Sequence, residues 1–122
     1  MSMSYIIHAG RRVVVMRGAG VLTAEEIYDA REKIRTDRTF DPSYAQLFDL
    51  RDVAQVDISL PAMARLAASA VFSPGVRRAF VCTDDIQYQM AETYSALSEP
   101  HEQVIHVFRE MNVAEAWLLS GS

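Results

Sequence analysis

Short apolar runs recur along this chain and alternate with longer stretches of helical periodicity. The runs at residues 5–7 and 13–16 flank the segment Ala9-Gly10-Arg11-Arg12 and predict a β-hairpin. Further apolar runs predict three more strands, at residues 44–50, 78–82 and 104–108. The third strand is rich in large apolar residues, so we expect it near the centre of a sheet.

Four helices are predicted between and after these strands, because each helical segment follows a residue that caps helix N-termini. The capping residues are Thr23, Ser59, Asp84 and Asn112. We expect the helices to run to about Arg35, over residues 60–72, up to Pro100, and from Asn112 toward the end of the chain.

The resulting order is strand, strand, helix, and then alternating strand and helix. This order predicts an α/β fold with a mixed sheet of about five strands and about four helices, in which right-handed crossovers join the parallel strands. The chain has 122 residues, half of them apolar. That is enough for one packed core and too little for two, so residues 1–122 are predicted to form a single domain.

The periodicity also predicts which helix faces turn inward. The first helix presents Ile27, Ala30 and Ile34 to the core, and its charged residues, Arg31 among them, are expected mostly on the solvent side. The third helix is expected to turn a stripe of Ile86, Met90, Tyr94 and Leu97 inward. The last helix is expected to turn Val113, Ala116 and Trp117 inward.

Charge and cysteine content narrow the function classes. A net charge of -4 argues against a nucleic-acid partner or an anionic membrane surface, which require clustered positive charge. The lone Cys82 has no second cysteine to pair with, which fits a reducing cytoplasm. The N-terminal residues lack a secretory pattern, and no apolar run approaches the roughly 20 residues of a membrane span. We therefore expect a cytoplasmic protein without an integral membrane segment.

The segment Phe48-Asp49-Leu50-Arg51-Asp52-Val53-Ala54-Gln55-Val56-Asp57-Ile58-Ser59 resembles the STAS motif of anti-sigma-factor antagonists. The order of strands and helices, down to the closing Glu115-Ala116-Trp117-Leu118, is similar to that of SpoIIAA-like proteins. The resemblance implies a SpoIIAA-like (STAS) fold and a regulatory role in which a loop and the following helix dock a protein partner. Ile58 stands where that family usually has its phosphoacceptor serine, and Leu60 where it has a glycine.

Four residues in this region are candidates for a partner-binding or switch site: Arg51, Asp57, Ser59 and Met63. Ser59 either caps the second helix with its hydroxyl or, when phosphorylated, changes the charge that a partner meets. Asp57 either closes a turn or contacts the partner. Arg51, Arg77 and Arg78 could hold an anion near this surface, although exposed arginines are usually only solvated.

No catalytic or metal-binding arrangement emerges from the sequence. No base is placed to activate Ser59, and none of His8, His101 and His106 has a partner at metal-ligand spacing. The segment Gly18-Ala19-Gly20 lacks the lysine of a phosphate-binding loop, and a turn between strand and helix accounts for it. We expect no enzymatic activity and no cofactor.

The second helix is apolar on almost every side, with Arg65 and Ser69 its only polar side chains. It must therefore be covered by neighbouring elements, or by a protein partner or a second copy of the chain. The sequence thus predicts a non-catalytic interaction module that docks through the loop at residues 51–59 and the helix at 60–72. The alternative is a domain that binds a small apolar ligand or lipid through Met63, Phe72, Tyr88, Met90 and Tyr94, unless these side chains only fill the core.

Overall fold

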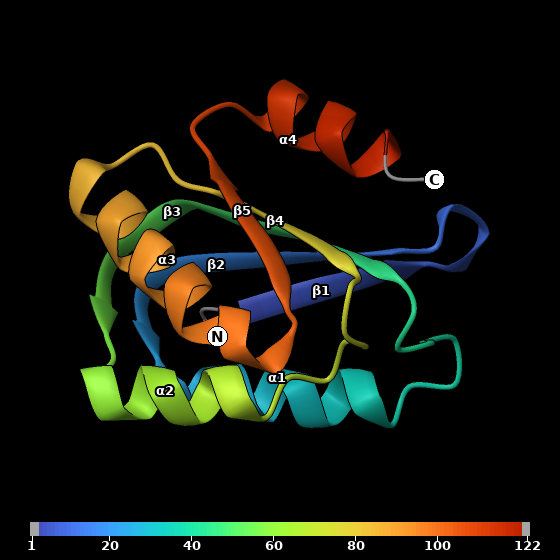
Figure 1. Cartoon of the computed structure of the whole chain (residues 1–122), viewed down its shortest axis with the longest axis horizontal. Coiled ribbons are helices and arrows are strands. Elements are labelled where there is room, and N and C mark those ends of the chain that lie inside the picture. The colour runs from blue at the N-terminus through green and yellow to red at the C-terminus, as the bar shows by residue number, and fades with distance from the viewer. Residues whose placement is uncertain (1–2, 121–122) are drawn as a thin grey trace.

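The computed structural model describes residues 3–120, which are built around one five-stranded sheet (Figure 1). The strands are β1 (Met3–His8), β2 (Val13–Thr23), β3 (Ala45–Asp57), β4 (Arg77–Val81) and β5 (Val104–Phe108). They lie side by side in chain order. β1 is antiparallel to β2, and the other three neighbouring pairs are parallel. The predicted hairpin and mixed α/β sheet are confirmed.

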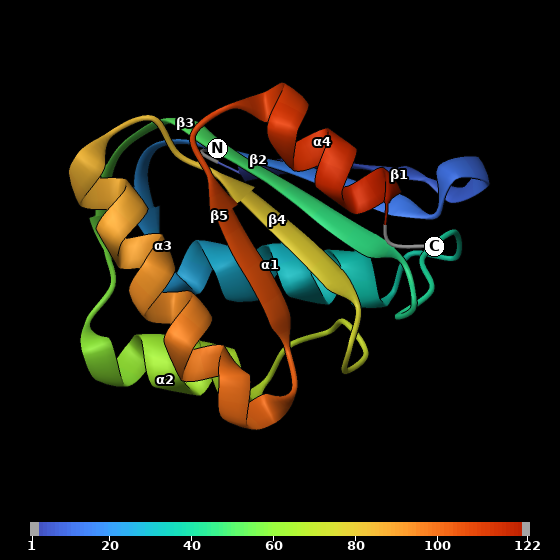
Figure 2. The same ribbon diagram turned by 45° about the horizontal axis from the view of Figure 1, so that its top comes forward.

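Right-handed crossovers explain how the helices are distributed. α1 (Ala24–Arg35), α2 (Leu60–Ala68) and α3 (Asp85–Ser98) each connect two neighbouring parallel strands. Because strand order follows chain order and such connections share one hand, all three helices lie on one side of the sheet (Figure 2). α4 (Met111–Leu119) follows the last strand and packs on the opposite side. Two short 3-10 turns, η1 (Ala9–Arg11) and η2 (Glu99–His101), complete the chain.

β2 and β3 are longer than predicted, and the expected loop at residues 51–59 is wrong. β3 continues to Asp57 and pairs with β2 over this whole stretch. The register between the two strands shifts twice within residues 17–21, where Gly20 adopts a φ of +67°. These irregularities interrupt the alternation of apolar and polar positions, so the pattern does not reveal the strand. The glycines at 18 and 20, expected in a turn, lie inside β2.

Each face of the sheet has its own hydrophobic cluster, because neighbouring residues of a strand point to opposite sides. In β3, Phe48 and Leu50 face α1, α2 and α3, whereas Leu47 faces α4. The larger cluster contains Val14, Met16, Ile34, Phe48, Leu50, Phe72 and Phe80. The smaller cluster contains Leu47, Ala79, Val81 and Ala114.

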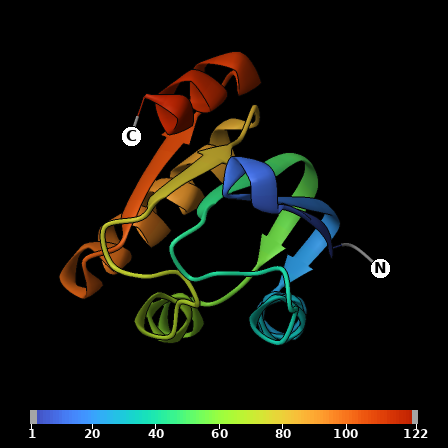
Figure 3. The same ribbon diagram turned by 90° about the vertical axis from the view of Figure 1, so that its right-hand side faces the viewer.

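α2 is shorter than the predicted helix at residues 60–72 and ends at Ala68. The Ser69 hydroxyl donates back to the carbonyl of Arg65, and the Arg31 guanidinium donates to the carbonyls of Leu66 and Ser69. These bonds use carbonyls that an extended helix would have paired internally. α2 lies beside α1 and α3 under the sheet, as the end-on view in Figure 3 shows for α1 and α2.

Several inward-facing assignments also need correction. In α3, Ile86 is 67% exposed, and Gln87, Ala91 and Ser98 are the buried residues. In α4, Ala114 is buried and Val113 is 45% exposed. Met90, Tyr94 and Trp117 do face inward as predicted, so the correction concerns Ile86 and Val113.

Candidate functional site

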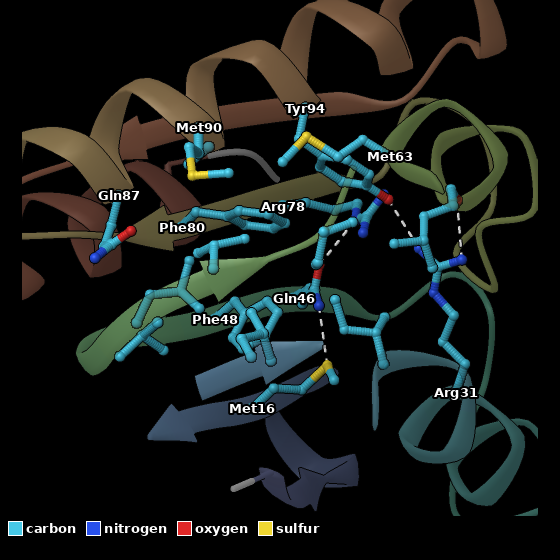
Figure 4. A pocket seen from close by; sticks show the side chains of 18 of the residues that line it. Met16, Arg31, Gln46, Phe48, Met63, Arg78, Phe80, Gln87, Met90 and Tyr94 are labelled. Atoms are coloured by element: carbon cyan, nitrogen blue, oxygen red, sulfur yellow. Dashed lines mark hydrogen bonds between the residues drawn. The ribbon is translucent and has the colours of Figure 1, made fainter. Parts of the chain in front are cut away.

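A largely apolar cavity of about 70 Å³ lies between α2 and the sheet. β2, β3, β4 and all three helices of this side contribute to its walls (Figure 4). Met16, Met63 and Met90 lie on different walls, and Phe48 and Phe80 lie between the two ends that Figure 4 shows. The cavity is possible because the backbone of α2 packs mainly beside α1 and α3, so only its side chains reach toward the strands.

One end of the cavity holds an arginine that is almost completely buried. Arg78 of β4 is 2% exposed, so the expectation of a solvated arginine at this position is wrong. Its Nε donates to Gln46 Oε1 at 2.8 Å, and its Nη1 donates to Gln103 Oε1 at 2.9 Å. The guanidinium also lies over the rings of Phe72 and Phe80, 5.1 and 5.7 Å from their centroids.

No carboxylate pairs with Arg78 among residues 3–120. Its charge is stabilised by the side-chain amide oxygens of Gln46 and Gln103, by the faces of Phe72 and Phe80, and by Tyr94. Burial, reinforced by the nearby charge of Arg31, lowers the pKa of Arg78, and Tyr94 acts in the opposite direction. An almost fully buried cation without an anionic partner costs stability, because an ion pair or water would hold it better.

A second arginine reaches the same end of the cavity from α1. Arg31 is 8% exposed, which corrects its expected place on the solvent side. Its Nη1 donates to the Leu66 carbonyl at 2.9 Å, and its Nη2 donates to the Tyr94 hydroxyl oxygen at 2.8 Å. The sequence did contain a signal for this burial, because Arg31 follows Ile27 by four residues and precedes Ile34 by three, which places it on the apolar face.

The opposite end of the cavity carries a neutral polar group. Gln87 of α3 donates from Nε2 to the Ala54 carbonyl at 2.9 Å. Its Oε1 atom is buried and has no hydrogen-bond partner in the structure. Figure 4 shows Gln87 at one end of the lining and Arg31, Arg78 and Tyr94 at the other. The lining therefore has an apolar middle, a cationic end and a hydrogen-bond acceptor at the far end.

The structure does not bring the four sequence-predicted site residues together. Arg51 lies on the α4 side of β3 and binds Asp49, and Asp57 ends β3 as an exposed residue. Ser59 is exposed and caps α2, its hydroxyl accepting a bond from the Ala62 amide. Met63 is buried and lines the cavity. Sequence reasoning missed Gln46 and Gln87, whose polarity gave no sign of burial.

Comparison with known proteins defines the fold. No protein-family model matches the sequence, and no curated protein matches it. Among solved structures, a crystal structure of an uncharacterised protein of the DUF3478 family from Shewanella loihica PV-4, with a SpoIIAA-like fold, matches with a TM-score of 0.62. The match covers 96% of this chain and 94% of the other, at 16% identity. This chain therefore has a SpoIIAA-like fold, as its sequence implied. None of the helices within residues 3–120 is long and apolar enough to cross a membrane.

Proposed function

We propose that this chain is a non-catalytic binding domain that holds a small apolar ligand in the cavity between α2 and the sheet. The observation that carries the proposal is the cavity itself, because protein interiors otherwise pack with few voids larger than a water molecule. Apolar cavities stay dry and accept small apolar molecules. The lining contains no His, Cys, Ser, Asp or Glu, which supports binding rather than catalysis.

The methionines in the walls set the size of the ligand. A cavity of about 70 Å³ holds only a few heavy atoms, and an apolar cavity of about 150 Å³ is known to hold benzene. Met16, Met63 and Met90 have long, unbranched side chains that can change rotamer and enlarge the space. The ligand that fits this description has a short, unbranched hydrocarbon body.

Methyl NMR of methionine-labelled protein tests the proposal with hexan-1-ol as the probe. We expect saturable shifts of the methyl signals of Met16, Met63 and Met90. Met3 and Met111 are not part of the lining and serve as internal controls. Ala91→Leu, which adds volume at the wall, should weaken binding, whereas Ile86→Ala at an exposed site of the same helix should not. Absence of shifts up to the solubility limit, or equal shifts at these five of the six methionines, contradicts the proposal.

A second candidate function is protein docking at the far end of β3. β3 pairs with β4 only at residues 46–49, so residues 51–57 are paired with β2 on one side alone. A partly unpaired strand edge can accept a strand from another chain. Leu60, which follows this edge, is 59% exposed. The occupant that this geometry favours is a second copy, because two identical edges can pair antiparallel about a twofold axis.

Light scattering over a dilution series tests the docking candidate. A concentration-dependent dimer that Leu60→Glu weakens would support it, and Ile6→Glu, at a similarly exposed residue of β1, provides the control. A strict monomer at every concentration would contradict it.

The switch hypothesis for Ser59 is a separate question. A phosphate there would add up to two negative charges at the start of α2, where helix amides tolerate them. Intact-mass measurement of protein made in its native host should show an adduct that is absent from Ser59→Ala. If no adduct appears under any growth condition, phosphorylation does not regulate this chain.

A further inference from the structure

The cationic end of the cavity collects hydrogen-bond donors without an anion to receive them. The Tyr94 hydroxyl oxygen accepts a bond from Arg31, and Tyr94 also favours the charged form of Arg78 by raising its pKa. Since both arginines can only donate, the Tyr94 proton must be offered elsewhere. No acceptor for that proton occurs among residues 3–120. Two guanidinium groups and one hydroxyl therefore converge on a place where the chain supplies no negative charge (Figure 4).

Neighbouring groups stabilise the positive charge of Arg31 better than that of Arg78. Arg31 donates to carbonyls at the C-terminal end of α2, where the helix dipole carries partial negative charge. Arg78 donates hydrogen bonds to the side-chain oxygens of Gln46 and Gln103, lies over the neighbouring rings, and has no helix terminus to accept its charge. Elsewhere the chain does pair its buried charge, since Asp49 is held by Arg51. Among the described residues, the lack of a carboxylate partner is thus specific to the buried arginine at the cavity.

We propose that the ligand of this cavity is an apolar monocarboxylic acid, whose carboxylate accepts hydrogen bonds from Arg78, Arg31 and Tyr94. Its hydrocarbon body extends between Phe48, Phe80 and Met90 toward Gln87. This inference rests on the proposed function and adds the chemical class of the ligand. A bound carboxylate supplies one negative charge and two acceptor oxygens at the end of the cavity where the donors converge.

A carboxylate fits this end better than a phosphate does. Phosphoryl groups carry up to two charges and three acceptor oxygens, and they are usually held by backbone amides at helix N-termini or by several exposed cations. Here the oxygens of Gln46 and Gln103 stand beside Arg78 and would repel a second negative charge. The remaining lining is apolar, which suits a hydrocarbon chain and not a sugar or nucleotide.

Paired titrations separate the inference from the function on which it rests. Hexanoate and hexan-1-ol have the same chain length and differ only in the head group. By methyl NMR at pH 7 we expect hexanoate to bind at least about tenfold more tightly, as charge-assisted hydrogen bonds in a dry site allow. If both probes bind and the alcohol binds as tightly as the acid, the inference is wrong and the proposed function stands. If neither binds, the proposed function fails.

Variants locate the head group. Arg78→Met removes the least compensated cation and should abolish the preference for hexanoate over hexan-1-ol. Tyr94→Phe removes only the hydroxyl and should reduce the preference several-fold, and it decides the matter if Arg78→Met does not fold. Arg51→Met, on the other side of the sheet, is the control and should change neither affinity. A preference for hexanoate that survives both Arg78→Met and Tyr94→Phe overturns the assignment.

Discussion

The two sides of the sheet treat buried charge in opposite ways. On the α4 side, Asp49 is 7% exposed and receives two bonds from the Arg51 side chain, each 2.9 Å long. On the side of α1, α2 and α3, Arg78 is 2% exposed and has no carboxylate among the described residues. The buried charge on the α4 side thus has an oppositely charged partner, and the buried charge on the other side has none among the described residues. Under the proposed function, one side serves stability and the other retains a costly group that a ligand stabilises.

The α4 side of the sheet is also packed more tightly than the side of α1, α2 and α3. Ala79, Val81 and Ala114 on the α4 side are small and completely inaccessible to solvent. The other side combines large aromatic and methionine side chains with a cavity. Small residues allow α4 to approach the sheet closely. On the side of α1, α2 and α3, the large side chains leave a space between the helices and the sheet. Substitutions on the two sides should therefore have different costs.

The largest difference should come from truncating neighbouring residues of β4. Phe80→Ala enlarges the existing cavity and should lower the free energy of unfolding by about 3–5 kcal/mol. Val81→Ala, whose side chain faces α4, removes only two methyl groups and should cost about 2 kcal/mol. Urea unfolding followed by circular dichroism measures both. Equal losses would show that the aromatic wall contributes no more to stability than the small α4-side core.

Adding the same volume on each side is the second test. Ala114→Leu forces a larger side chain against Ala79 and Val81 and should cost about 1–3 kcal/mol. Ala91→Leu adds the same atoms at the cavity wall, where free space can receive them, so stability should change by less than about 1 kcal/mol in either direction. Thermal unfolding of the two variants is the measurement. A similar loss in both would mean that the cavity side is packed as tightly as the α4 side.

The sequence predicts the fold well where elements have a plain pattern. β5 was predicted at residues 104–108 and lies there, because its run of apolar residues is short and bounded by polar ones. The far ends of β2 and β3 escaped prediction, since glycines and register shifts break their alternation. α2 ends early because Arg31, 35 residues before Leu66, caps its carbonyls. A contact over that separation leaves no local trace in the sequence.

The candidate site was predictable only in part. Of the five side chains that the sequence indicates as a potential ligand-binding cluster, Met63, Phe72, Met90 and Tyr94 line the cavity and Tyr88 does not. Arg78 was expected at the surface, as strand-end arginines usually are. Its burial depends on Gln46 and Gln103, which come from 32 and 25 residues away. Only the three-dimensional structure brings these polar groups together.

The compensated charge on the α4 side makes a pH-dependent prediction. Hydrogen bonds from the Arg51 side chain lower the pKa of Asp49 below its ordinary 3.8, and this outweighs the effect of burial. A lowered pKa in the folded state means that the contribution to stability is present above pH 3.8 and is lost as pH falls through the folded-state pKa. Asp49→Asn should therefore cost about 1–2 kcal/mol at pH 7, with the cost shrinking toward zero as the pH is lowered below 3.8. Urea unfolding at both pH values measures this, and a cost independent of pH would exclude the ion pair as its source.

The smallest effect is expected three residues further along β3, at an ion pair that differs from the Asp49 pair in exposure. Arg17 Nη2 lies 2.6 Å from Asp52 Oδ2, but their side chains are 60% and 54% exposed. Water solvates both groups in the folded and unfolded chain, so Asp52→Asn should change the free energy of unfolding by less than about 0.5 kcal/mol. The same urea titration at pH 7 places the variant beside Asp49→Asn. A larger loss for Asp52→Asn than for Asp49→Asn would mean that burial does not control the value of these pairs, and the contrast drawn between Asp49 and Arg78 would lose its physical basis.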